Sequence, residues 1–328
     1  MLLSKVFHTD KDLEIRSIMF DSRKESPDSI FFAMKGKIND GHAFIGKAIA
    51  NGAICIVHSD PVDREDGIVY IQTEDVTSAY VTFCKAFYDN AIDRMNVVGI
   101  TGTNARPSIA PTFGVENMMG TNPLTFALPT DEEFPFCIDC ATSVVQRGKI
   151  EFYARQGMDT PSGTVISNDG SYMTDSQEIL KALVDGTAAL APLGGAGDEM
   201  AGYKGYGYAA VVEILSAALA GGQFMKALTG RTPEGGRQMY HLGHFFFVVD
   251  PDAFMGREEF RKTAGDICRA LRASKKAPGH DRIYTAGEKE YLAWLDRKDK
   301  GVPLNASEMS DLTAVRDKLG LDYKFPWE

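Results

Sequence analysis

Short apolar runs alternate with helical stretches between residues 15 and 104, and this alternation constrains the fold of the chain most strongly. The runs are rich in β-branched residues and bounded by Asp, Gly or Pro, which is typical of strands. They cover residues 15–20, 30–34, 53–57, 68–71 and 97–100. Helical spacing lies between them at residues 43–51, which end in Asn51-Gly52, and at residues 76–88. The pattern predicts a mainly parallel sheet with helices packed against it.

The sequence changes character after about residue 105, where Gly and Pro become more frequent. A glycine-rich loop, residues 193–207, precedes a long apolar helix predicted over residues 208–220, and it is the best local candidate for a ligand site. Beyond it the pattern predicts a buried strand and two helices, at residues 245–249, 257–274 and 307–319. Because 328 residues exceed one ordinary core, we expect two α/β domains, residues 1–100 and 101–328.

Composition argues against several classes of partner. The chain has 35 Lys and Arg against 45 Asp and Glu, a net charge of −10, whereas binding to a nucleic acid backbone requires a concentrated positive surface. No apolar run reaches the roughly 20 residues that cross a bilayer, and the N-terminus lacks a signal-peptide core. The five cysteines do not form the dense pattern of a small secreted domain, so we expect reduced thiols and a cytoplasmic protein. A small molecule is the expected partner.

Gly99-Ile-Thr-Gly-Thr-Asn104 follows a predicted strand and begins like a phosphate-binding loop. Such a loop closes with Gly-Lys-Ser/Thr, but Ala105, Arg106 and Pro107 stand at that place here. Proline offers neither the N–H nor the hydroxyl that would hold phosphate and magnesium. The segment is therefore interpreted as a plain turn from a strand into a loop.

Three further polar features each have two interpretations. The first is Cys137-Ile-Asp-Cys140, which has the spacing of a metal or redox motif. No second pair of ligands accompanies it, and a strand would point the two thiols to opposite faces of the sheet. We therefore expect these cysteines to pack within a strand, and we expect no metal site. Asp139 lies within an apolar run and is expected to be buried, bonded either to a ribose or to a backbone turn. Lys204, between glycines ahead of the apolar helix, is either an anion contact or a solvated loop residue.

The first hundred residues resemble the N-terminal domain of the Mur ligases, most closely the UDP-N-acetylmuramoyl-tripeptide synthetases. The matching strings are Asp21-Ser-Arg23, Ile30-Phe-Phe-Ala-Met-Lys-Gly36, Asp40-Gly-His42, Ala48-Ile-Ala-Asn-Gly-Ala53 and Gly99-Ile-Thr-Gly-Thr-Asn104. The resemblance implies an α/β domain that holds the UDP end of a muramoyl substrate, with Ser22, Lys37, Ile38 and Asn39 as contacts to a UDP-sugar. The Gly-Lys-Thr that follows in that family is absent, so no ligase activity is expected.

From about Thr101 to its end, the chain resembles the type 2 malate/L-lactate dehydrogenases, whose relatives include ureidoglycolate and sulfolactate dehydrogenases. The matching strings are Ala110-Pro111, Gly120-Thr-Asn-Pro123, Asp139-Cys-Ala-Thr-Ser143, Gly148-Lys149, Leu193-Gly-Gly195, Lys204-Gly-Tyr-Gly207, Gly243-His-Phe-Phe-Phe247 and Asp250-Pro251. The resemblance implies a mixed-sheet α/β domain that is not a Rossmann fold, truncated at its N-terminal side, and a homodimer.

This resemblance also implies a cofactor and a substrate. The cofactor is NAD or NADP, and the residues that match the family's cofactor contacts are Thr103, Asp139, Cys140, Ala141, Lys204, Gly287 and Glu288. Ala286 stands where the family usually has proline. The substrate is a small 2-hydroxy or 2-oxo acid, bound near Arg147 and Lys149.

In the dehydrogenase family a helical segment with a Ser-His-Arg group supplies the proton donor for reduction of a ketone, and residues 1–100 contain no such segment. We therefore expect an NAD(P)-dependent oxidoreductase whose chemistry is impaired or absent. The alternative is a UDP-muramoyl-peptide binding module, and a third hypothesis is that each half has lost the partner surface that its core requires. A crossover at Thr101-Gly-Thr-Asn104, whether natural, engineered or introduced in assembling the sequence, is the simplest explanation of both resemblances.

Overall fold

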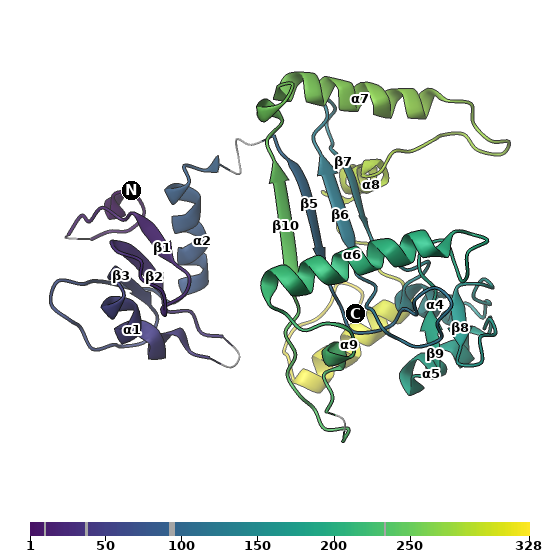
Figure 1. Ribbon diagram of the computed structural model, residues 1–328, viewed down its shortest axis with the longest axis horizontal. Coiled ribbons are helices and arrows are strands. Elements are labelled where there is room, and N and C mark those ends of the chain that lie inside the picture. Colours follow the sequence, from purple (N-terminus) through teal and green to yellow (C-terminus); the bar gives the residue numbers. More distant parts are fainter. Residues whose placement is uncertain (10, 37–38, 92–95, 233) are drawn as a thin grey trace. The chain divides into compact units, whose positions relative to one another are not determined.

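The computed structural model describes the chain except for residues 10, 37–38, 92–95 and 233 (Figure 1). The chain divides into two compact units, Met1–Met95 and Asn96–Glu328. The strand predicted over residues 97–100 is observed as β5 (Val98–Thr103). It pairs with strands of the second unit, so it begins that unit instead of ending the first sheet.

A four-stranded parallel sheet forms the centre of the first unit. Its strands lie in the order β1 (Ser17–Met19), β2 (Ser29–Phe32), β3 (Ala53–His58) and β4 (Val69–Gln72), and each neighbouring pair is parallel. The helices among the described residues of this unit are η1 (Leu3–Lys5), η2 (Gly41–Phe44), α1 (Ile45–Ala50) and α2 (Val76–Phe87). The parallel sheet predicted from the alternating pattern is confirmed.

Both faces of this sheet are buried, which explains why its strands read as continuous apolar runs. On one face Phe32 of β2 belongs to the same core cluster as Phe83 of α2. On the other face Phe31 belongs to a cluster with Ala48 of α1. The two helices thus cover opposite sides of the sheet.

The main sheet of the second unit has the order β10 (His244–Val249), β5, β6 (Leu124–Leu128) and β7 (Phe136–Cys140). All three neighbouring pairs are antiparallel, and Phe246, Thr101, Thr125 and Asp139 lie in one row across it. The expectation of a mixed sheet here is wrong for these four strands. A short turn joins β6 to β7, and such turns can only connect antiparallel neighbours.

The remaining elements of the second unit surround this sheet. They are α4 (Arg147–Arg155), β8 (Val165–Ser167), α5 (Ser176–Asp185), β9 (Ala188–Leu190), α6 (Gly202–Ala220), η3 (Met225–Thr229), η4 (Pro251–Ala253), α7 (Arg257–Ala273), α8 (Glu288–Arg297) and α9 (Ala306–Leu319). Figure 1 shows α6 and α7 crossing opposite ends of the sheet. A closed core of α4, α5, β8 and β9 lies beside it and includes Ile150, Val165, Ile179 and Leu190. In the described part of the chain, no helix is both long and apolar enough to cross a membrane.

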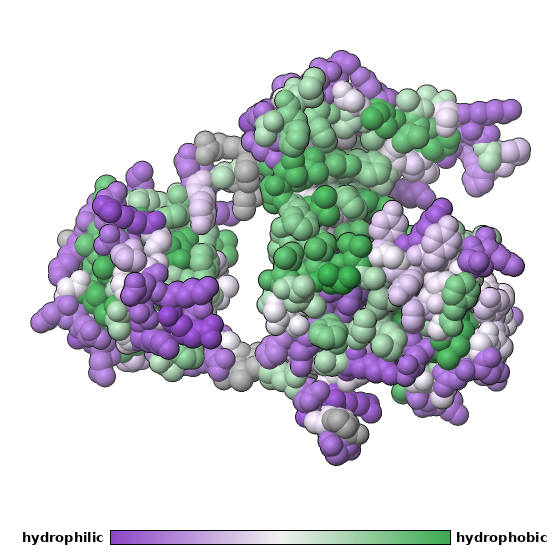
Figure 2. All heavy atoms as spheres, viewed as in Figure 1, coloured by the Kyte–Doolittle hydropathy of each residue, from purple (hydrophilic) through white to green (hydrophobic). Residues whose placement is uncertain are grey.

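One face of the main sheet is largely uncovered. Phe246 and Val248 of β10 are 73% and 61% exposed, and no residue of β6 is fully buried. Figure 2 shows hydrophobic side chains gathered over the region of β10 and β5. The carboxylate of Asp139 also lies on this open face, so the expectation that it is buried is wrong.

A buried carboxylate links the sheet to α6. Glu213 of α6 is 3% exposed and accepts hydrogen bonds from Asn122 Nδ2 at 2.7 Å and from the Met225 N–H at 2.8 Å. Asn104 Nδ2 lies 3.4 Å from the same carboxylate. Because a charge out of contact with water requires such donors, Glu213 holds together the end of β5, the loop before β6 and the start of η3.

The two asparagines extend this network to the backbone. Asn104 accepts a hydrogen bond from the Gly243 N–H at 3.0 Å and donates one to the Gln223 carbonyl at 2.8 Å. Asn122 accepts one from the Ala105 N–H at 3.2 Å. Both side chains are fully buried, so the turn that begins like a phosphate loop ends in a structural asparagine.

Replacing Asn104 with Ala is expected to lower the free energy of unfolding of the second unit by about 2 kcal/mol, because the Gly243 N–H and the Gln223 carbonyl then lose their partner. Urea denaturation followed by circular dichroism measures the change. Asn168→Ala is the matched control, since that side chain is exposed and has no hydrogen bond within the described chain, and it should shift stability by less than about 0.5 kcal/mol. Equal stability of the two variants would contradict the assigned role of the network.

Candidate functional site

A small polar pocket lies between β7 and the loop that leads into α8. It has a volume of about 290 Å³ and is lined by Cys137, Ile138, Asp139, Tyr284, Thr285, Ala286, Gly287, Lys289 and Glu290. Two of the predicted cofactor residues, Asp139 and Gly287, therefore meet here although 148 positions in the sequence, 287 minus 139, separate them. We refer to this site as the β7–α8 pocket.

Gly287 allows the two sides of this pocket to approach closely. Its φ is +88°, and a Cβ at this position would lie 2.9 Å from the Pro135 carbonyl oxygen and 3.1 Å from the Cys137 nitrogen. The Cys137 N–H donates a hydrogen bond to the Ala286 carbonyl at 3.2 Å. Any larger residue would therefore be strained by its backbone angle and would push the α8 loop away from β7.

Asp139 presents a carboxylate to this pocket from the open face of the sheet. Its Oδ1 accepts a hydrogen bond from the Thr125 hydroxyl of the neighbouring strand at 2.7 Å. No protein donor bonds its Oδ2 among the described residues, so that oxygen can still accept hydrogen bonds from a ligand. The partner of Asp139 within the protein is thus a hydroxyl of the sheet, not a backbone turn.

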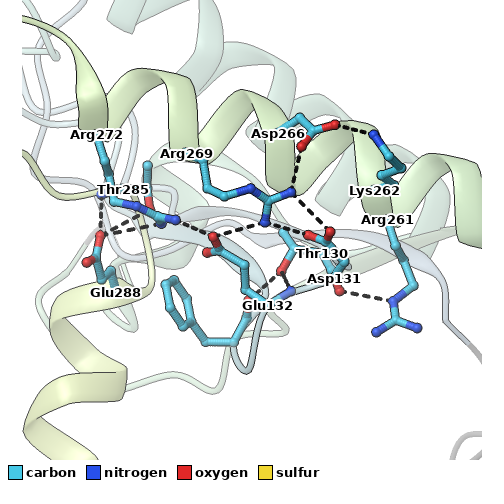
Figure 3. A network of polar contacts seen from close by, with 11 residues as sticks. Thr130, Asp131, Glu132, Arg261, Lys262, Asp266, Arg269, Arg272, Thr285 and Glu288 are labelled. Carbon is cyan, nitrogen blue, oxygen red and sulfur yellow. Dashed lines mark hydrogen bonds and ion pairs between the residues drawn. The ribbon is translucent and has the colours of Figure 1, made fainter.

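Glu288 follows Gly287 but its side chain is directed into the protein, where it is 1% exposed. It accepts hydrogen bonds from the Thr285 N–H at 3.0 Å and from Arg282. Arg272 lies 3.7 Å from the same carboxylate (Figure 3). Burial by itself raises the pKa of Glu288, but the Thr285 N–H and the two guanidinium groups outweigh it, so the pKa lies below its ordinary value. Glu288 can act on a ligand only through the loop that it holds.

Helix α7 fastens this loop to the turn between β6 and β7. Arg269 bonds both oxygens of Asp131, at 2.9 and 3.0 Å, and this pairing lowers the pKa of Asp131 (Figure 3). Arg272 bonds Glu132 and donates to the Thr285 hydroxyl at 2.9 Å. Since Thr285 is part of the pocket wall, the ion pairs of α7 determine where that wall lies.

A second and larger pocket lies beside the N-terminus of α4. Its volume is about 720 Å³, and its lining consists of Cys140, Ala141, Ser143, Val144, Val145, Gln146, Gly148, Lys149, Phe152 and Leu193. It contains three of the predicted site residues, Cys140, Ala141 and Lys149. We refer to it as the α4 pocket. Because Cys137 to Asp139 line the first pocket and Cys140 and Ala141 line this one, β7 connects the two.

The two predicted cations of the α4 pocket differ in their surroundings. Arg147 Nε donates to Glu151 Oε1 at 2.9 Å and is not part of the lining. Lys149 Nζ lies 4.9 Å from the ring centres of Phe152 and Tyr153 and has no acidic partner among the described residues. Lys149 is therefore the cation that the pocket presents.

Two other predicted cofactor residues lie outside both linings. The Thr103 hydroxyl is within 3.0 Å of the Gly243 carbonyl and 3.1 Å of the Asn104 carbonyl. Lys204 is exposed in the first turn of α6, which begins at Gly202 and not at residue 208 as predicted. The helix extends because Gly202 has no side chain, and a Cβ there would lie 1.9 Å from the Gly195 carbonyl oxygen. Lys204 is thus a helix residue instead of a loop residue.

In the first unit, Ser22 and Asn39 line one pocket of about 590 Å³. Lys37 and Ile38 lie outside the described residues. Arg23 of this lining is paired with Asp21 at 2.8 Å, and the pairing lowers the pKa of Asp21. Lys47 also lines the pocket and has no ion-pair partner in the described chain.

Sequence reasoning missed a cluster formed by Asp40, His42 and Asp60, whose ligand atoms lie within 4.8 Å of one another. His42 Nδ1 is 2.5 Å from Asp40 Oδ1, and His42 Nε2 accepts the Ser59 N–H at 3.2 Å. Both ring nitrogens therefore already have partners, and Asp60 is paired with Lys35. The spacing Asp40-Gly-His42 was the available signal. The cluster is interpreted as structural.

Cys137 and Cys140 line different pockets, and burial raises the pKa of both thiols.

Glu288→Gln is expected to lower the free energy of unfolding by about 2 kcal/mol at neutral pH, because a hydrogen-bonded charge is removed between two arginines. The pKa of Glu288 is lower in the folded than in the unfolded protein. The ionised side chain therefore contributes fully to the free energy of unfolding above its pKa in the unfolded protein, about 4.3. This contribution is lost as the pH falls through the pKa of Glu288 in the folded protein. The difference from the wild type should therefore shrink below about pH 4. Urea titrations of wild type and variant at pH values above and below 4 measure this difference in the free energy of unfolding. Glu258→Gln is the control, because the side chain of Glu258 is exposed. A difference that does not change with pH would be inconsistent with the ion-pair role.

Comparison with known proteins identifies the family of the chain. The family model described as malate/L-lactate dehydrogenase matches residues 38–313. A malate dehydrogenase of Pyrococcus horikoshii is 37% identical over 226 residues, which are 69% of this chain and 60% of that protein. An L-sulfolactate dehydrogenase of Methanocaldococcus jannaschii is 30% identical, over 72% of this chain and 63% of the relative.

A solved structure agrees with these sequence matches. The crystal structure of malate dehydrogenase from Entamoeba histolytica superimposes with a TM-score of 0.65 at 38% identity, covering 70% of this chain and 63% of that one. The chain thus spans less than two thirds of the length of each of these three relatives. These matches give no support to the Mur-ligase resemblance or to a crossover near Asn104, which stay predictions. The predicted dehydrogenase resemblance is confirmed at the level of the family: the chain belongs to the malate/L-lactate dehydrogenases, a family of NAD(P)-dependent oxidoreductases.

Proposed function

We propose that the second unit binds NAD or NADP and a small 2-hydroxy or 2-oxo acid, as an oxidoreductase of this family does. The observation that carries the proposal is the arrangement of the predicted residues along β7. Asp139 and the following Cys140 and Ala141 line two pockets that succeed each other along one strand. A dinucleotide in one pocket and an acid in the other would thus be neighbours.

The β7–α8 pocket fits the polar part of a dinucleotide. Asp139 has a free carboxylate oxygen, which is the type of acceptor that ribose hydroxyls use, and Gly287 lets the loop before α8 lie close to β7 and so forms the other wall. Lys204, exposed in the first turn of α6, lies outside this lining, and its predicted contact with a pyrophosphate stays a prediction. When bound, the nicotinamide group gives or takes the hydride, while the protein supplies binding and orientation. NAD and NADP are both compatible with this set of residues.

The α4 pocket fits the acid. Malate and sulfolactate, the substrates in the names of two relatives, are small hydroxy acids. Such a molecule needs a cation for its carboxylate, and Lys149 lines the pocket while Arg147 lies on the same helix turn. The lining contains no histidine among the described residues, so no imidazole is available there to supply the proton that ketone reduction requires. We propose that turnover by this chain is correspondingly slow.

Quenching of protein fluorescence by NADH tests cofactor binding. The wild type should bind, and Gly287→Ala should weaken binding about tenfold or more, since the strain of the left-handed backbone and the contact with β7 both displace the pocket wall. Gly279→Ala is the matched control, because its φ of +81° is similar but its Cβ would meet no atom within 4 Å. No response of the wild type at millimolar NADH would overturn the cofactor assignment, and equal loss in both variants would overturn the role of Gly287.

A second candidate function rests on the first unit, where Ser22 and Asn39 line the same pocket as unpaired Lys47. We propose that this pocket binds a UDP-muramoyl peptide without turnover. Titration of the full chain with UDP-N-acetylmuramoyl dipeptide should shift the NMR signals of Ser22 and Asn39, and Lys47→Gln should weaken binding about threefold to tenfold through loss of a phosphate contact. Lys85→Gln, an exposed lysine of α2, is the control. Unchanged spectra would remove this candidate.

A further inference from the structure

Strand β10 is an open edge of the main sheet. It lies at one end of the strand order and, among the described residues, pairs with β5 alone. At the other end, the Cys137 N–H of β7 is bonded to the loop before α8. β10 has six residues, whereas the other described strands at sheet ends have three to five. It is therefore the longest described edge to which a further strand can be added.

A threonine of β5 shows which backbone groups of β10 point outward. The Thr101 hydroxyl donates a hydrogen bond to the Phe245 carbonyl at 2.8 Å, so this carbonyl points toward β5. In an antiparallel strand the N–H and C=O groups of one residue point to the same side, and the side alternates from residue to residue. The residues whose backbone groups point away from the sheet are therefore His244, Phe246 and Val248.

Nothing in the described chain protects this edge. No described backbone group bonds the outward N–H and C=O groups of β10. Natural edge strands are protected by charged side chains, proline or a bulge, but His244–Val249 contains no Asp, Glu, Lys, Arg or Pro and pairs with β5 in a regular register. Phe246 and Val248 are 73% and 61% exposed, within the hydrophobic region of Figure 2. An edge of this kind favours addition of another apolar strand.

The edge is complementary to itself. When a second β10 lies antiparallel beside the first and the pair is centred on Phe246, the two Phe246 residues face each other. His244 of each copy then faces Val248 of the other. Facing residues of this kind exchange both N–H···O=C bonds, so every outward backbone group of the three residues is bonded. Because the strand carries no charged side chain, a two-fold axis brings no like charges together.

We propose that β10 is an interface between two copies of this chain, in which the two β10 strands pair about a two-fold axis and join the main sheets into one. The Phe246 side chains of the two copies meet on the open face, with their Cα atoms about 5.5 Å apart. The dehydrogenase resemblance implies a homodimer but not its surface. Strand β10 supplies that surface and its register, whether or not the proposed function holds.

Light scattering after size-exclusion chromatography of the full chain tests the interface. The wild type should have twice the mass of one chain, with a dissociation constant of about 10 µM or less. Phe246→Lys should raise this constant about a hundredfold or more, because two ammonium groups then face each other across the axis. Phe254→Lys is the matched control, since Phe254 is 75% exposed but lies outside β10, and it should dimerise as the wild type does.

Phe246→Pro tests the backbone pairing separately. The N–H of residue 246 points away from β5, so proline removes no bond within the sheet but blocks the added strand. This variant should also be monomeric, and circular dichroism on heating checks that each variant is folded. A wild type that is monomeric at about 100 µM, or a dimer that persists in either Phe246 variant, would show that a second copy does not cover this edge.

Disulfide formation tests the register. On oxidation, Phe246→Cys should give a covalent dimer on a non-reducing gel, because Cα atoms about 5.5 Å apart can be bridged. Val248→Cys should give far less, since its neighbour in the second copy is His244. The wild type, with its five cysteines, sets the background. Equal crosslinking of the two variants, or none above the background, would contradict pairing centred on Phe246.

Discussion

The buried carboxylate of Glu213 is the interaction on which the second unit depends. A charge removed from water requires several donors, and here they come from segments that are far apart in the sequence, at Asn104, Asn122 and Met225. Satisfying one side chain therefore fixes the end of β5, the loop before β6 and the helix α6 relative to one another. The segment Thr101-Gly-Thr-Asn104 begins like a phosphate loop. In this structure it places the side chain of Asn104 beside the carboxylate of Glu213. Its role is structural.

The candidate site is built on the scaffold that this network fixes. Strand β7 supplies one wall of both pockets, and the opposite walls come from the loop before α8 and from the first turn of α4. The loop before α8 has little apolar packing of its own, and the ion pairs of Arg269 and Arg272 hold it in place (Figure 3). These ion pairs and hydrogen bonds fix the position of the loop before α8, and they lie outside the pocket, which stays free for a ligand.

Packing is unevenly distributed over the second unit. The core around Ile150 and Ile179 is closed, whereas Phe246 and Val248 of the main sheet are exposed on a face that shows as hydrophobic in Figure 2. Regions with few buried apolar contacts are the first to open locally. The exposed sheet face is consistent with the hypothesis that this half requires a further surface, while the closed core and the Glu213 network show that a large part of it is well packed without one.

By itself the sequence determined the parallel sheet of the first unit, the helices α1, α2, α6, α7 and α9 and membership of the dehydrogenase family, because hydrophobic periodicity and local motifs are properties of neighbouring residues. It did not predict α4, α5 or α8. It did not determine which polar groups meet. The direction of Glu288 into the protein, the pairing of Arg147 but not Lys149, and the start of α6 at Gly202 all follow from contacts with distant segments or from the packing of a particular turn. Burial and charge pairing depend on the assembled fold, so the tertiary structure alone decided which of the predicted residues face a pocket.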